Sequence, residues 1–157
     1  MNKIKLIIIM VLFMGSFATV QTKPFAIQDI DSLMQEQPKP ILILLSTDWC
    51  KYCQMQKKQL EKNKDFLKQS DDFYYVIFNA EQKEPIVFQS QLFSYRAIGQ
   101  SSGIHELAIA LNGSENIAFP TWILLDTNYE VLLRYGGVIS PKQVKNLLNI
   151  IDKSKKE

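Results

Sequence analysis

The residues with the clearest chemistry are Cys50 and Cys53, which are the only two cysteines in the chain of 157 residues. They are separated by two residues and follow the continuous apolar run Ile41–Leu45. Two thiols at this spacing suit thiol–disulfide exchange, in which one thiolate attacks and the other resolves the mixed disulfide. A purely structural bridge is disfavoured, because closing so short a loop restricts the unfolded chain very little.

The same two thiols are poor candidates for a metal or haem site. A structural zinc ion takes four protein ligands, and the chain adds only one distant histidine, His105. Haem attachment requires a histidine directly after the second cysteine, where Gln54 stands. We therefore expect no metal and no organic cofactor, although a copper role for an exported dithiol stays open. His105 is expected to cap a helix or to lie on the surface.

The first 18 residues have the pattern of a secretory signal peptide. Lys3 and Lys5 precede an apolar block at residues 6–14, and small residues follow up to Ala18. The block is much shorter than the roughly 20 apolar residues that cross a bilayer. We expect cleavage after Ala18 and a mature protein that is periplasmic or secreted.

The remaining residues, 24–157, are enough for one domain with its own core. The formal net charge of +2 gives no reason to expect a polyanionic partner, and no nucleic-acid binding is predicted. A monomer is the expected state.

Apolar patterning predicts alternating helices and strands in this domain. Residues 25–37 and 51–68 have apolar positions at helical spacing, whereas 41–45 and 73–78 are apolar or aromatic runs typical of buried strands. Residues 122–125 and 131–135 are expected to form a hairpin, and a last helix begins at Pro141 with Ser140 as its cap. This order predicts an α/β fold with a central mixed sheet and helices on both faces.

The chain resembles the thioredoxin family over roughly residues 25–152. The resemblance rests on the buried strand leading into Trp49-Cys50-Lys51-Tyr52-Cys53, on Phe119-Pro120-Thr121 opening a later strand, and on Gly136-Gly137. It implies a thioredoxin-like fold and a Cys50–Cys53 disulfide, with Cys50 as the exposed nucleophile and Cys53 as the buried resolving thiol. It also implies a cis-proline facing the pair and a ring of supporting and substrate-binding residues, namely Trp49, Lys51, Tyr52, Phe119, Pro120 and Thr121.

The chain departs from the family pattern at three places. Lys51-Tyr52 replaces the Gly-Pro of classical thioredoxins, and Leu44 stands where they have a buried acid. Residues 81–116 form an insert, for which we predict a hairpin from 86–88 and 92–95 and a helix over 103–111. Such an insert either flanks the active site or merely extends the scaffold.

These features together predict an exported thiol–disulfide oxidoreductase that exchanges disulfides with protein substrates. We favour a reductase, which requires an electron donor such as a membrane thiol relay. The alternatives are a thioredoxin-fold protein-binding or chaperone module with incidental redox chemistry and, less favoured, a copper-handling protein.

Overall fold

A four-stranded sheet forms the centre of the computed structural model, which describes residues 23–155. The order is β2-β1-β7-β8, with β1 at Ile41–Ser46, β2 at Tyr74–Asn79, β7 at Thr121–Leu125 and β8 at Val131–Gly136. β1 is parallel to β2 and antiparallel to β7, and β7 is antiparallel to β8. The predicted mixed sheet and the β7–β8 hairpin are therefore confirmed. The predicted signal peptide, residues 1–18, lies outside the described residues.

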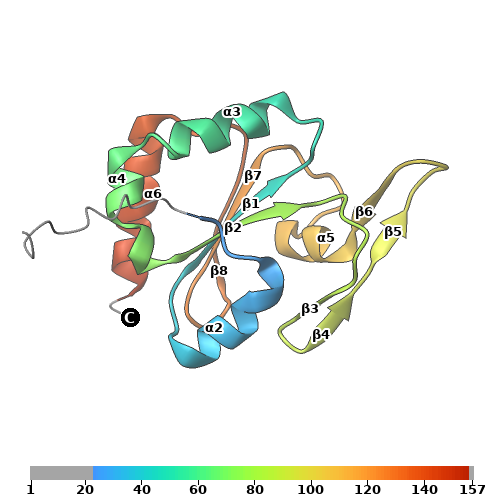
Figure 1. The fold of residues 1–157 in the computed structure, drawn as a ribbon, viewed down its shortest axis with the longest axis horizontal. Coiled ribbons are helices and arrows are strands. Elements are labelled where there is room, and N and C mark those ends of the chain that lie inside the picture. The colour runs from blue at the N-terminus through green and yellow to red at the C-terminus, as the bar shows by residue number, and fades with distance from the viewer. Residues whose placement is uncertain (1–22, 156–157) are drawn as a thin grey trace, which may run out of the picture.

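Helices cover both faces of the sheet (Figure 1). One face carries α3 (Lys51–Leu60), α4 (Lys64–Lys68) and α6 (Pro141–Ser154), and the other carries α2 (Ile30–Glu36) and α5 (Glu106–Asn112). Every residue of β1 is buried, and its side chains alternate between the two cores. This burial on both faces is what a continuous apolar run predicts for a central strand. Within residues 23–155, no helix is long and apolar enough to cross a membrane.

The helix predicted over residues 25–37 is shorter in the structure, because the chain is extended at Phe25 and α2 begins only at Ile30. Phe25 forms a single parallel bridge with Val76 at the outer edge of β2, and its N–H donates to the carbonyl of Tyr75 at 2.8 Å. A short 3₁₀ helix, η1, follows at Ile27–Asp29 and leads into α2. The extended backbone at Phe25 is therefore used for strand pairing.

The single helix predicted over 51–68 is wrong, because the chain breaks into α3 and α4. The side chain of Asn63 accepts a hydrogen bond from the Phe66 N–H at 3.0 Å and so caps a new helix. Asparagine is among the strongest N-cap residues. The 3₁₀ helix η2 (Ser70–Asp72) then leads to β2. Because of this break, α3 is a separate helix of ten residues that begins at the cysteine pair.

The insert contains two short antiparallel pairs and one helix. The predicted hairpin is confirmed as β3 (Ile86–Phe88) with β4 (Gln91–Phe93). The helix predicted over 103–111 is wrong at its start, since β6 (Gly103–His105) pairs with β5 (Tyr95–Ala97) before α5 begins. α5 ends at Gly113, whose φ of 75° is the left-handed conformation that glycine adopts at helix ends.

His105 joins the end of β6 to the start of α5. Its side chain is fully buried, so the predicted capping role is confirmed and the predicted surface position is wrong. Nδ1 accepts the N–H of Leu107 at 3.2 Å, which leaves Nε2 to donate to the carbonyl of Glu84 at 3.1 Å. Burial lowers the pKa of His105, although the Glu84 carbonyl and the carboxylates of Glu106 and Glu84 oppose this shift. The acceptor role of Nδ1 and the lowered pKa both favour the neutral imidazole in the folded state.

The stability of the protein is expected to fall on mild acidification because of His105. The pKa is below its ordinary value of 6.5 in the folded state, so the unfolded chain binds the proton more readily. The stabilisation is present above pH 6.5 and is lost as the pH falls through the folded pKa. Urea unfolding between about pH 7.5 and pH 5 measures this slope.

The matched variant for this test is His105→Asn, because asparagine also caps helices but does not titrate. The variant is expected to lose the His105 part of the pH dependence. An unchanged slope in His105→Asn would show that other groups control the acid sensitivity.

Candidate active site

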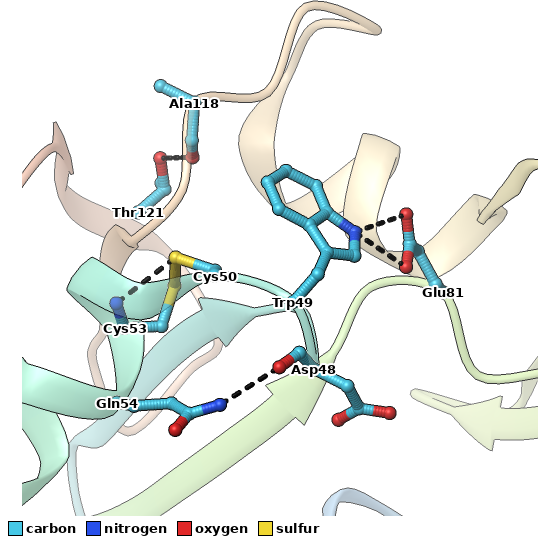
Figure 2. The surroundings of a disulfide bond; sticks show 8 residues. All are labelled: Asp48, Trp49, Cys50, Cys53, Gln54, Glu81, Ala118 and Thr121. Carbon is cyan, nitrogen blue, oxygen red and sulfur yellow. Dashed lines mark hydrogen bonds between the residues drawn. A yellow bond between two sulfur atoms is a disulfide. The ribbon is translucent and has the colours of Figure 1, made fainter.

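The two cysteines form a disulfide at the N-terminus of α3, directly after the central strand β1 (Figure 2). Cys50 is the N-cap residue, and its Sγ accepts the backbone N–H of Cys53 at 3.0 Å. The first turn of a helix presents unpaired N–H groups and the positive end of the dipole. The same environment lowers the pKa of a thiol and stabilises its thiolate once the disulfide is reduced.

The two sulfur-bearing residues differ in access. Cys50 keeps 4% of its surface exposed and Cys53 keeps none, so the pair is more buried than expected but Cys50 is the accessible member. Lys51 and Tyr52, between them, both lie exposed at the start of α3. Leu44, at the position of the family's buried acid, is fully buried in the apolar core beside α3 and α6.

The loop before β7 lies beside the cysteine pair. The Phe119–Pro120 peptide bond is cis, as the resemblance implies. The Thr121 hydroxyl donates to the carbonyl of Ala118 at 2.7 Å, and both residues lie near the disulfide in Figure 2. Gly137, whose φ is 113°, donates its N–H to the Pro120 carbonyl at 2.7 Å. This bond connects the end of β8 to the proline loop and fixes the loop against the sheet.

Trp49 links the cysteine loop to the proline loop and to the insert. Its ring packs edge-on against Phe119, with 6.1 Å between the ring centroids. Its Nε1 donates to both carboxylate oxygens of Glu81, at 3.1 and 3.0 Å (Figure 2). Glu81 is not predictable as a site residue from the sequence, because nothing local marks a glutamate that contacts a residue 32 positions away.

Two polar side chains of α3 are shielded from solvent, and one of them, Gln56, lies on the same buried face as Cys53. Gln56 is fully buried, and its amide bonds both backbone groups of Ile139, accepting the N–H at 2.6 Å and donating to the carbonyl at 3.3 Å. Lys57, one turn after Cys53, is half-buried. Burial lowers the pKa of Lys57, and the nearby Asp48 carboxylate opposes this shift. The spacing of Cys53, Gln56 and Leu60 at three and four residues is the sequence signal for this buried face.

The Cys50–Cys53 disulfide lies at the start of the helix that follows the central strand, beside a cis-proline loop. This arrangement is that of a dithiol–disulfide protein of the α/β class. The family model described as a thioredoxin-like domain matches residues 28–151. The chain therefore belongs to the thioredoxin-like family, and its fold and cysteine pair support thiol–disulfide oxidoreductase activity. In a sequence comparison, no curated protein matches the chain.

Solved structures with the same fold are distant in sequence. A thioredoxin-fold protein from Helicobacter pylori is 18% identical, with a TM-score of 0.52 over 89% of this chain and 84% of its own. A DsbH oxidoreductase is 15% identical, with a TM-score of 0.53 over 83% and 84%. A thioredoxin from Malassezia sympodialis is 17% identical, with a TM-score of 0.50 over 82% of this chain and 90% of its own. At these identities the likeness shows the shared fold.

Proposed function

We propose that the protein is an exported reductase of protein disulfides that uses Cys50 and Cys53. The observation that carries the disulfide exchange itself, whichever its direction, is the position of Cys50 Sγ, which caps α3 and accepts the N–H of Cys53. This hydrogen bond and the helix dipole stabilise a thiolate at the accessible member of the pair. The segment Asp48-Trp49-Cys50, with its resemblance to exported reductases, favours the reducing direction.

The reaction follows from the two positions of the thiols. In the reduced protein, the Cys50 thiolate attacks one sulfur of a substrate disulfide, and the other substrate sulfur leaves as a thiolate that takes a proton from water. Cys53, also as a thiolate, then attacks Cys50 Sγ and releases the second substrate thiol. The substrate gains two electrons, and the protein ends with the Cys50–Cys53 disulfide that the structure shows.

The buried resolving thiol has no carboxylate partner at the family's usual position, because Leu44 occupies it. We infer that the Cys53 proton leaves to solvent or to the departing substrate, and that resolution is slower than in classical thioredoxins. Outside the cytoplasm, the protein would be returned to its dithiol state by a membrane thiol relay. Export rests on the charged, apolar and small-residue pattern of residues 1–18.

The reduction potential of the Cys50–Cys53 pair tests the proposed direction. Equilibration with defined thiol buffers, followed by alkylation of free thiols, gives the ratio of dithiol to disulfide. A reductase is expected near thioredoxin's value of about −270 mV, whereas a value nearer about −120 mV would identify an oxidant. If the Cys50–Cys53 pair does not exchange with the thiol buffers at all, the proposed enzymatic function is wrong.

A protein-binding module is the second candidate function, and the exposed aromatic side chains beside the disulfide favour it. Trp49 and Tyr52 are each 66% exposed beside the disulfide, which gives partner segments a large apolar contact. In that case, partners would bind the protein equally well whether the pair is oxidised or replaced by serine. Retained cellular activity in a Cys50→Ser variant would support this candidate.

A further inference from the structure

We propose that Glu81 is a positioning residue that fixes the Trp49 ring beside Cys50 and thereby determines how well protein substrates are bound. The inference rests on the proposed exchange of disulfides with protein substrates and names the residue that shapes the contact surface. Glu81 opens the insert, so the inference also gives the insert a functional connection to the active site.

The Trp49 ring requires a restraint because two-thirds of it is exposed. A side chain with 66% exposure makes few packing contacts that fix its rotamer. The indole N–H is instead directed at both oxygens of the Glu81 carboxylate, at 3.1 and 3.0 Å. Hydrogen bonds to an ionised acceptor are stronger than neutral ones. With the edge contact to Phe119 on another side, the ring is restrained between the insert and the proline loop.

Glu81 is itself restrained by its neighbours. Its backbone N–H donates to Oδ1 of Asn79 at 3.0 Å, and Nδ2 of Asn79 donates to Oδ2 of Asp48 at 3.2 Å. Asp48 directly precedes Trp49, so the contacts form a closed circuit: Asp48, Asn79, Glu81 and Trp49. These contacts fix the Glu81 backbone at the end of β2, from which its carboxylate reaches the indole N–H.

The position of the Trp49 ring is expected to matter more for protein substrates than for small disulfides. Trp49 adjoins Cys50, the sulfur-bearing residue that a partner reaches, and a protein segment bound there contacts the ring. A tryptophan that is already held in its binding position costs less conformational entropy when a partner binds. A small aromatic disulfide reaches Cys50 without needing the ring. Loss of Glu81 is therefore expected to affect the two substrate classes differently.

The experiment compares Glu81→Met, which removes the acceptor, with Glu81→Gln, whose carbonyl oxygen still accepts the indole N–H. Reduced protein is mixed with insulin as the protein disulfide and with 5,5′-dithiobis(2-nitrobenzoate) as the small one. Glu81→Met is expected to lower the rate constant for insulin about tenfold, the effect of one charge-assisted hydrogen bond, and that for the small disulfide less than about twofold. Glu81→Gln is expected to restore the insulin rate to within about twofold.

Fluorescence quenching gives a readout that does not depend on activity. The chain has two tryptophans, and Trp122 is fully buried, so added iodide or acrylamide reports on Trp49. Quenching is expected to increase in Glu81→Met and to stay unchanged in Glu81→Gln. Glu84→Met, the same change three residues further on at an exposed position, is the control and is expected to behave as wild type.

Three results would overturn the inference. The first is an unchanged insulin rate in Glu81→Met, and the second is an equal loss with both substrates, which would place the effect on the Cys50 thiol. The third is a loss in Glu84→Met as large as that in Glu81→Met. A wild-type protein that reduces neither substrate would instead overturn the proposed function, and the inference with it.

Discussion

Replacing Cys50 with serine is expected to abolish disulfide exchange, whereas replacing Cys53 with serine is expected to trap the intermediate. A serine hydroxyl does not form a mixed disulfide, so Cys50→Ser falls to the uncatalysed rate. In Cys53→Ser the accessible thiol remains and still attacks, but nothing resolves the adduct. Mass spectrometry of each variant after incubation with insulin detects the adduct, which dithiothreitol removes.

The two variants are controls for each other, because both lose the Cys50–Cys53 disulfide. A stability change common to both therefore does not explain different chemistry. An adduct in Cys50→Ser but none in Cys53→Ser would reverse the assigned roles. Full complementation of a cellular defect by Cys50→Ser would show that the redox chemistry is incidental and that binding is the function.

Replacing Gln56 with leucine is expected to cause the largest loss of stability among changes near the site. The Gln56 amide satisfies both the N–H and the carbonyl of Ile139 in a fully buried position. Leucine fills a similar volume but leaves two buried backbone groups unpaired, at about 1–3 kcal/mol each. We expect the free energy of unfolding to fall by about 2–4 kcal/mol, measured by urea denaturation of the oxidised protein.

Gln59→Leu is the matched control: Gln59 is exposed one turn along α3 and accepts a hydrogen bond from Gln56 Nε2 at 3.3 Å, so the change removes that bond but leaves both bonds from Gln56 to Ile139. Its effect is expected to stay within about 1 kcal/mol, because surface substitutions seldom cost more. A Gln56→Leu protein as stable as this control would mean that Ile139 finds other partners. The test shows whether α3, with the disulfide at its start, is held to the segment before α6 by this one side chain.

The central elements were predictable because each has a signal that tertiary structure does not override. The apolar run 41–45 requires burial on both faces, and Ser140 with Pro141 is a strong helix start that the structure completes with a capping box from Gln143. The insert was harder to predict. Residues 103–105 continue the apolar pattern of α5, but pairing with β5 holds them as a strand. Helical periodicity in a segment does not show whether a neighbouring strand will pair with it.

Some residues of the candidate site could likewise be predicted from the sequence, and others could not. Cys50, Cys53 and Pro120 belong to short motifs, so their positions could be assigned from spacing and resemblance. Glu81 and Gln56 contact their partners across 32 and 83 residues, respectively. A glutamate in a loop and a glutamine in an amphipathic helix have no distinguishing local pattern. Only the fold brings them to the tryptophan and to the backbone that they bond.

The strand pairs between residues 86 and 105 can change without disturbing the central sheet. β3 pairs with β4 and β5 with β6, outside the four-stranded sheet, while buried Ile86, Phe88 and Ile104 hold the insert's ends in the core. Residues 89–102 between those ends therefore contribute nothing to the register of the central sheet. Doubling the length of a flexible loop costs only about 0.6 kcal/mol. Natural selection can thus lengthen or rewrite this segment to suit new partners, while the catalytic scaffold stays unchanged.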